Sequence, residues 1–197
     1  MPTNPNPQGK GLVPALEALM ACQPVQICAK QPRHLLADYL TSLLVLSAEF
    51  SFRIVPGQTY YLYLKDDVWK LSLIAPEQWR SERRGHAIGA CELQQDMTWR
   101  LEPHSGLAHT PKALQMLADF HTGFLELIGQ SGTLEESLPT YAAHLPFYRR
   151  ALATGLATSL RRSITLSGLS DRSDWADRAV PTLLELTAAR QYTPTPS

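Results

Sequence analysis

The part of this sequence that most restricts its fold lies between residues 54 and 103. Apolar and polar side chains alternate through residues 59–65 and again through residues 68–74. An alternation with a period of two places one set of side chains on each face of a strand. Asp66 and Asp67 separate the two runs and are typical turn residues. The stretch therefore predicts a β-hairpin, with a two-residue loop at the aspartates or a slightly longer loop.

The alternation also predicts the register of this hairpin. With the two aspartates at the centre of the loop, apolar side chains of one strand lie opposite apolar side chains of the other. A shift by one residue would place apolar opposite polar along the whole ladder. The predicted pairs are Leu64 with Trp69, Leu62 with Leu71 and Tyr60 with Leu73 on one face, and Tyr63 with Lys70, Tyr61 with Ser72 and Thr59 with Ile74 on the other.

Two more strands are predicted after the hairpin. Pro76 ends the second strand, because proline has no N–H to donate to a ladder, and it can begin a single helical turn that leads to Trp79. Residues 86–93 predict a third strand, in which Gly89 marks a bulge or a close backbone approach. Residues 98–101 predict a short fourth strand. A small antiparallel sheet cannot bury its apolar face alone, so helices must cover it.

Apolar residues at helical spacing flank the sheet on both sides. Residues 33–50 carry them at three- and four-residue steps, in a stripe broad enough to predict burial on more than one side. Residues 111–129 begin at a proline, residues 147–166 predict a long helix, and a last helix is expected after residue 170. The predicted fold class is α+β: N-terminal helices, a small four-stranded antiparallel β-meander and a C-terminal helical extension.

The length of 197 residues suits one domain, or a core with a closely packed helical extension. We find no internal repeat and no long linker. The predicted division is a disordered N-terminus at residues 1–10, a helix-plus-sheet domain at residues 11–103, a helical extension at residues 104–190 and a disordered tail at residues 191–197.

The central stretch resembles a known family. The run PGQTYYLYLKDDVWKLSLIAPEQW, followed by CELQQDMTW, resembles the C-terminal half of the uncharacterised family called domain of unknown function (DUF) 2452. The resemblance covers the first half of the chain, mainly residues 54–103, and implies helices followed by a small sheet. It implies no activity and no catalytic or binding residue. The residues that carry it include Pro56, Gly57, Tyr60, Tyr61, Leu62, Tyr63, Leu71, Trp79, Leu93, Asp96, Thr98 and Trp99.

Composition narrows the classes of function. Eighteen basic residues balance eighteen acidic ones, so no global field favours a nucleic acid or a membrane as partner. Cys22, Cys28 and Cys91 are too few for a disulfide framework and suit a reducing compartment. No export signal and no apolar run of about 18 residues is visible. We therefore expect a cytoplasmic protein with no membrane partner.

Motifs that specify a chemistry are absent from the sequence. It holds no P-loop, dinucleotide-binding glycine motif, nucleophile elbow or zinc-protease motif. His121 and His144 can meet, but a metal site needs three or four converging ligands. No catalytic residue, metal site or cofactor is therefore predicted. The leading hypothesis is a non-catalytic cytoplasmic interaction or regulatory module with a protein partner.

Nucleic-acid binding is the second hypothesis. No acidic residue lies within the Arg149–Arg162 helix, and Arg150 and Arg161 are about three turns apart on one face. Tyr61 and Tyr63 share a sheet face that, if open, can stack on unpaired bases. The alternatives are a solvated helix face and tyrosines that lie beneath a helix with only their hydroxyls exposed.

An enzyme with an unrecognised site is the third hypothesis, and Trp79, Asp96, Tyr61 and His86 are the first residues to test for it. Trp79 also has two structural interpretations. Its ring can close over the core as a lid, or it can form the wall of a pocket. The candidate binding residues are thus Tyr61, Tyr63, Trp79, Arg150 and Arg161.

Overall fold

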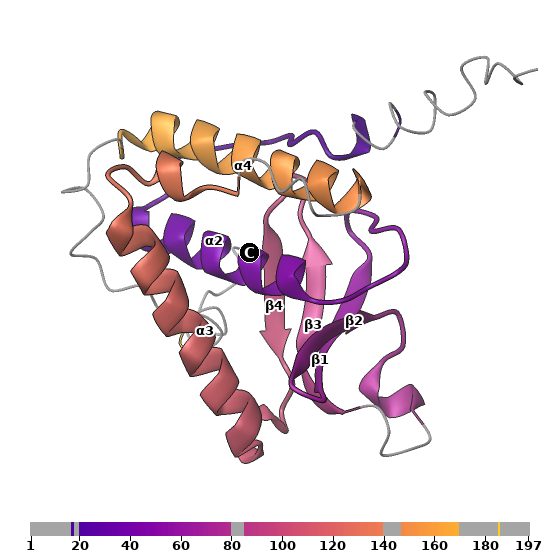
Figure 1. Cartoon of the computed structure of the whole chain (residues 1–197). Helices are drawn as coiled ribbons and strands as arrows, with labels where there is room; N and C mark the ends of the chain where they lie inside the picture. Colours follow the sequence, from indigo (N-terminus) through magenta and orange to yellow (C-terminus); the bar gives the residue numbers. More distant parts are fainter. Residues whose placement is uncertain (1–16, 18–19, 80–84, 140–146, 170–184, 186–197) are drawn as a thin grey trace, which may run out of the picture.

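The computed structural model describes residues 17, 20–79, 85–139, 147–169 and 185. Within these residues, a four-stranded antiparallel sheet lies behind helix α2, and α3 and α4 both contact α2 (Figure 1). The predicted α+β class is confirmed. The elements are α2 (Pro32–Ser47), β1 (Thr59–Lys65), β2 (Val68–Ser72), η1 (Pro76–Gln78), β3 (His86–Leu93), β4 (Trp99–Pro103), η3 (Leu107–His109), α3 (Pro111–Gln130), η4 (Glu135–Ser137) and α4 (Phe147–Ser167).

Several predictions fall on residues outside this description. They are the disordered ends at residues 1–10 and 191–197, the last helix after residue 170, and the meeting of His121 with His144. Of the predicted N-terminal helices, α2 is the one that the described residues contain in full. Separately, none of the helices in the described ranges is long and apolar enough to span a membrane.

The hairpin of β1 and β2 has the predicted register. Leu62 pairs with Leu71, and the neighbouring pairs are those that the alternation predicts as far as Ser72, where β2 ends. Asp66 and Asp67 have φ angles of 51° and 62°. Both residues therefore have the left-handed backbone conformation that a two-residue type I′ loop requires, and the longer loop is not formed.

The prediction of a meander is wrong in its strand order, which is β2-β1-β3-β4. The third strand pairs with β1 instead of β2. Glu49 explains this, because it forms a parallel bridge to the outer edge of β2. Its N–H donates to the Trp69 carbonyl at 2.8 Å, and its carbonyl accepts from the Leu71 N–H at 2.9 Å. The open edge of β1 is thus the place where β3 adds.

Gly89 has the role that the sequence predicts for it. The register between β1 and β3 shifts beside it, with Leu62 opposite Gly89 and Tyr63 opposite Ala87. A Cβ atom at Gly89 would lie 2.3 Å from the carbonyl oxygen of Glu102 on β4. The bulge and the close approach of two backbones therefore coincide at a residue without a side chain.

The main core lies between α2 and one face of the sheet. Tyr60, Leu62 and Leu64 of β1 are at most 1% exposed. The rings of Tyr60 and Trp99 meet edge to face at a centroid distance of 6.0 Å. Helix α2 is buried on several sides, as its broad stripe predicts, because α3 and α4 contact it in addition to the sheet. Its buried residues are Leu35, Leu36, Ala37, Tyr39, Leu40, Thr41, Ser42, Leu44 and Val45.

Candidate functional site

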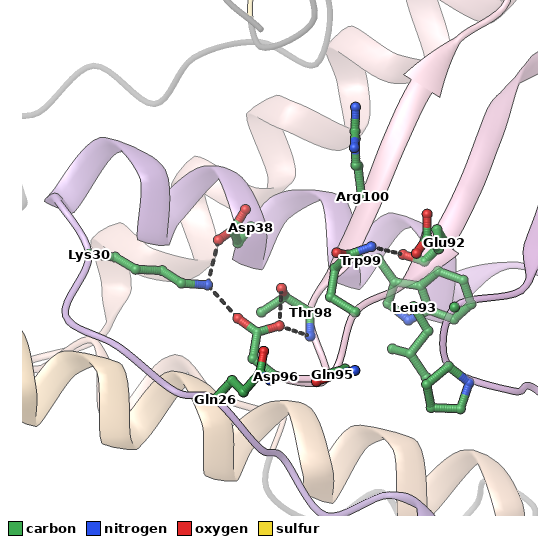
Figure 2. Close-up of a pocket in the computed structure, with 13 residues that line it drawn as sticks. Gln26, Lys30, Asp38, Glu92, Leu93, Gln95, Asp96, Thr98, Trp99 and Arg100 are labelled. Carbon is green, nitrogen blue, oxygen red and sulfur yellow. Dashed lines mark hydrogen bonds and ion pairs between the residues drawn. The ribbon is translucent and has the colours of Figure 1, made fainter. Parts of the chain in front are cut away.

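A polar pocket of about 720 Å³ lies at the end of the sheet where β3 turns into β4 (Figure 2). Gln26 and Lys30 of the segment before α2 form one side of it, and Asp38 comes from α2. The turn at Pro56 and Gly57 and the ends of β3 and β4 form the rest. Its volume falls within the range of about 300–1,000 Å³ that is usual for small-molecule sites.

Three charged side chains form the floor of the polar pocket. The Lys30 ammonium lies 2.8 Å from the Asp38 carboxylate and 2.7 Å from the Asp96 carboxylate. Each of these side chains is only 14% exposed. The other oxygen of Asp96 accepts hydrogen bonds from the Thr98 N–H at 3.0 Å and from the Thr98 hydroxyl at 2.6 Å. One lysine thus joins the segment before α2, α2 itself and the β3–β4 turn.

The pKa values of Lys30 and Asp96 are shifted in opposite directions. Burial acts to lower the pKa of Lys30, but the carboxylates of Asp38 and Asp96 outweigh it and raise that pKa above its ordinary value. Burial acts to raise the pKa of Asp96, but the bonds from Lys30 and Thr98 outweigh it and lower that pKa. Neither group is poised to exchange a proton at neutral pH, as a general acid or base must. The floor therefore carries one cation and two anions.

Backbone hydrogen bonds hold the walls of the polar pocket. The Val25 N–H donates to the Gln95 carbonyl at 2.8 Å, and the Gly57 N–H donates to the Leu93 carbonyl at 2.9 Å. Helix α4 fixes the segment before α2 from behind, because the Lys30 N–H donates to the Ser167 hydroxyl at 2.8 Å. Segments far apart in the sequence are thus fastened around one cavity.

Two charged side chains line the polar pocket from the sheet face that points away from α2. Glu92 of β3 and Arg100 of β4 are directly opposite each other in the strand register and both line the cavity. Glu92 is half-buried and Arg100 is exposed. Within the described part of the chain, no ion pair or side-chain hydrogen bond engages the charged end of either residue. A carboxylate and a guanidinium are therefore available to a ligand.

Tyr61 and Tyr63 share the sheet face that points away from α2, as predicted, but their surroundings differ. Tyr61 is half-buried, and Tyr63 is 2% exposed. The Tyr63 hydroxyl donates to the Ile74 carbonyl at 2.8 Å, and its ring meets Trp79 edge to face at a centroid distance of 6.2 Å. The segment after β2, and not a long helix, therefore covers Tyr63, and only Tyr61 offers a partly open ring.

Trp79 packs against Tyr63 and does not line the polar pocket. Its side chain is half-buried, and its Nε1 atom is buried without a hydrogen-bond partner in the described structure. The ring supplies buried area against Tyr63, on the sheet face that points away from α2, and not over the main core between α2 and the sheet.

Replacing Trp79 with alanine should lower the free energy of unfolding by about 1–3 kcal/mol, less than for a fully buried tryptophan. The matched control is Trp79→Phe, which keeps a ring against Tyr63 and removes the unpartnered N–H; it should cost less. Urea denaturation of the three proteins gives the comparison. Unchanged stability of Trp79→Ala, together with loss of a partner that the wild type retains, would instead make Trp79 part of a binding site.

The four residues proposed for an enzyme site do not converge. Asp96 lies in the polar pocket, whereas His86 lies at the opposite end of β3, beside a second cavity of about 320 Å³ that Asp67 and Lys112 also line. A strand rises about 3.3 Å per residue, so the eight residues of β3 separate the two ends by roughly 23 Å. Tyr61 lies opposite Ala90, between the two ends of β3, and Trp79 packs against Tyr63, whose partner on β3 is Ala87.

The arginines of α4 do not form one binding face with the tyrosines. Arg149 donates to the Ala48 carbonyl at 2.6 Å, and its guanidinium lies 4.4 Å from the centre of the Phe50 ring. Arg150 is half-buried, whereas Arg161 and Arg162 are exposed. Helix α4 packs beside α2 (Figure 1), and the face that carries the tyrosines points away from α2. The two halves of the predicted nucleic-acid surface are therefore on different sides of the molecule.

Sequence reasoning identified Asp96 and missed the other charged residues of the polar pocket. Lys30 lies in a segment without periodicity, and its ion pair with Asp96 spans 66 residues, so no local signal marks it. Glu92 and Arg100 did carry a signal. The turn between the predicted third and fourth strands places these opposite charges across from each other, as cross-strand pairs often are.

Among the described residues, no group of three or more histidine, cysteine, aspartate or glutamate side chains is placed to hold a metal ion.

Comparison with known proteins identifies a family that the chain resembles. No curated protein and no solved structure resembles the chain significantly. A family model described as "Protein of unknown function (DUF2452)" matches residues 18–122. This segment contains every residue that lines the polar pocket, as well as Tyr61, Tyr63 and Trp79, and it excludes α4. The chain therefore belongs to the DUF2452 family of proteins of unknown function.

Proposed function

We propose that this protein is a non-catalytic cytoplasmic interaction or regulatory module whose binding site is the polar pocket. One observation carries the proposal. The charges of the pocket floor are satisfied within the fold, while Glu92 and Arg100, which also line the pocket, have charged ends that no other side chain of the described structure engages. A rigid charged network beside available charged groups is an arrangement suited to recognition.

The charge state of the floor supports a binding role over a catalytic one. Lys30 and Asp96 have pKa values shifted away from neutrality in opposite directions, so each stays charged. The thiol of Cys91 is buried, which raises its pKa and keeps it protonated. A buried, protonated thiol is a poor nucleophile. What the polar pocket offers is a fixed set of charges and hydrogen-bonding groups.

The cytoplasmic part of the proposal rests on the cysteines. Cys22, Cys28 and Cys91 are all free thiols, and Cys28 is exposed. Free thiols of this kind suit a compartment that keeps cysteine reduced. Fractionation of cells that express the protein, followed by immunodetection, tests this assignment. Recovery of the protein in an exported fraction would contradict it.

Nucleic-acid binding is the second candidate, and the exposed pair Arg161 and Arg162 is the observation that favours it. It ranks second because Arg149 is used to hold the end of α2. Binding through these arginines to single-stranded RNA would weaken steeply as salt rises. A fluorescence-polarisation titration at low and at physiological salt decides the matter, and absence of binding at low salt would exclude it.

Affinity purification from native cells tests the proposed function. We would compare what the wild type, an Arg100→Glu variant and a Glu102→Lys variant retain, analysing both proteins and small molecules by mass spectrometry. Glu102 is a matched control, because it is an exposed charged residue on β4 that does not line the polar pocket. A component should be retained by the wild type and the control and lost from Arg100→Glu. Identical sets from all three proteins would contradict the proposal.

A further inference from the structure

We propose that the ligand of the polar pocket is a free α-amino acid, with its carboxylate on Arg100 and its ammonium group on Glu92. This inference rests on the proposed function, since it names the ligand class of the same site. It would make the protein a module regulated by a small zwitterionic molecule.

The first argument is the position of the two charged side chains. Glu92 and Arg100 are directly opposite on neighbouring antiparallel strands, which places their Cβ atoms about 4.5–5.5 Å apart. Neighbouring opposite charges of this kind commonly pair, yet no ion pair joins them in the described structure. They extend from adjacent strands at the same end of the sheet (Figure 2). An amino acid carries its own two opposite charges on one carbon, so it can engage both side chains at once.

The second argument is the sum of the charges. Lys30 is shared by Asp38 and Asp96, so the floor has a net charge of −1, and Glu92 and Arg100 cancel each other. Such a cavity repels a phosphate, which carries close to two negative charges. It accepts a zwitterion, and it favours one with a basic side chain. Guanidinium is also the side-chain group best shaped to bind a carboxylate through two parallel hydrogen bonds.

The third argument is the lining of the cavity beyond the two charges. The side chains of Gln26 and Gln95 are exposed at its rim, and Gln94 is half-buried. Amides donate and accept hydrogen bonds, so they suit a polar ligand side chain. The volume of about 720 Å³ leaves room for that side chain beside the zwitterionic head. We therefore expect arginine, lysine and glutamine to bind more tightly than glutamate.

Isothermal titration calorimetry on the full-length protein tests the ligand class. Arginine, lysine, glutamine and glutamate are titrated, together with arginine methyl ester, which lacks the carboxylate, and Nα-acetyl-arginine, which lacks the ammonium group. Arginine should bind at least about tenfold more tightly than either blocked form, as the loss of a charged partner implies. No binding of any amino acid at millimolar concentration would overturn the inference. Equal binding of the acetylated form would also overturn it and would assign recognition of a carboxylate alone.

Three variants tie the binding to the two side chains. Arg100→Gln should weaken arginine binding and abolish the preference over the methyl ester, whereas Glu92→Gln should abolish the preference over the acetylated form. Glu102→Gln should bind as the wild type does. Equal affinities in all three variants would overturn the inference. The ligand preferences of the wild type are measured without any variant, so a folding defect in a variant does not affect that result. If amino acids fail to bind while Arg100→Glu still loses a native component, the ligand class is wrong and the proposed function stands.

Discussion

Replacing Lys30 with methionine should lower the free energy of unfolding by about 3–5 kcal/mol, the range seen when one partner of a buried ion pair is removed. The substitution leaves the carboxylates of Asp38 and Asp96 without the cation that lies within 2.8 Å of both. Because these side chains are only 14% exposed, water cannot fully take the place of the ammonium group. The segment before α2 would also lose its attachment to the β3–β4 turn.

Lys70→Met is the matched control for this experiment. Lys70 pairs with Glu49 at 3.6 Å, but the two side chains are 41% and 64% exposed. An exposed pair of this kind contributes about 0–1 kcal/mol. Urea denaturation followed by tryptophan fluorescence measures both variants. A loss for Lys30→Met no larger than that for Lys70→Met would show that the network does not stabilise the fold. Adding Asp38→Asn and Asp96→Asn to Lys30→Met should recover part of the stability, since the unpaired charges are then gone.

The same network predicts how stability depends on pH. The pKa of Asp96 is lower in the folded protein than its ordinary value of 3.8, so its contribution is present above that value and is lost as the pH falls through the folded pKa. The pKa of Lys30 is raised above 10.5, so its contribution is present below that value and is lost as the pH rises through the folded pKa. Asp96→Asn should therefore lose less stability on acidification than the wild type does. Melting temperatures measured from neutral pH to below pH 4 test this, and parallel curves for the two proteins would contradict it.

Replacing Leu62 with alanine should cost about 2–5 kcal/mol, the range for a buried leucine whose removal leaves a cavity. Leu62 is 0% exposed at the centre of β1, opposite Leu71 on one side and Gly89 on the other. Gly89 has no side chain that can move into the space, and its strand is held close to β4. The cavity therefore cannot collapse easily.

Leu73→Ala provides the matched control for Leu62→Ala. Leu73 follows the end of β2 and is 48% exposed, so the same change of side chain should cost about 0.5 kcal/mol or less. Chemical denaturation of both variants gives the difference. A loss below about 0.5 kcal/mol for Leu62→Ala would mean that the two faces of the sheet are assigned the wrong way round.

Local features of this fold could be predicted from the sequence because each depends on neighbouring residues. The alternation on either side of Asp66 and Asp67 determined the hairpin and its register, since a slip by one residue exposes the whole apolar face. Pro111 at the start of α3 and Gly89 at the bulge follow from what proline and glycine allow the backbone to do. The α+β class follows from these elements together.

The order of the strands was decided by tertiary structure. The sequence predicts α2 to continue to residue 50, but it ends at Ser47, because Glu49 gains two hydrogen bonds by joining the edge of β2. That contact occupies the edge on which a meander would place β3. No sequence pattern within residues 48–50 indicates that the helix ends early. The two hydrogen bonds that favour this end form only once β2 lies beside these residues.

The candidate site was determined by the sequence only in part. Asp96 was recognisable as a polar residue of a predicted turn, and Glu92 and Arg100 as opposite charges on predicted neighbouring strands. The sequence alone left Lys30 without a role, because it lies in a connector whose path depends on hydrogen bonds to α4 and to the β3–β4 turn. Burial strengthens the attraction between these charges. A lysine and two aspartates attract one another only weakly in water, and here they lie where water is largely excluded. The residue types were set by the sequence, and their meeting in one pocket was set by the packing of segments far apart along the chain.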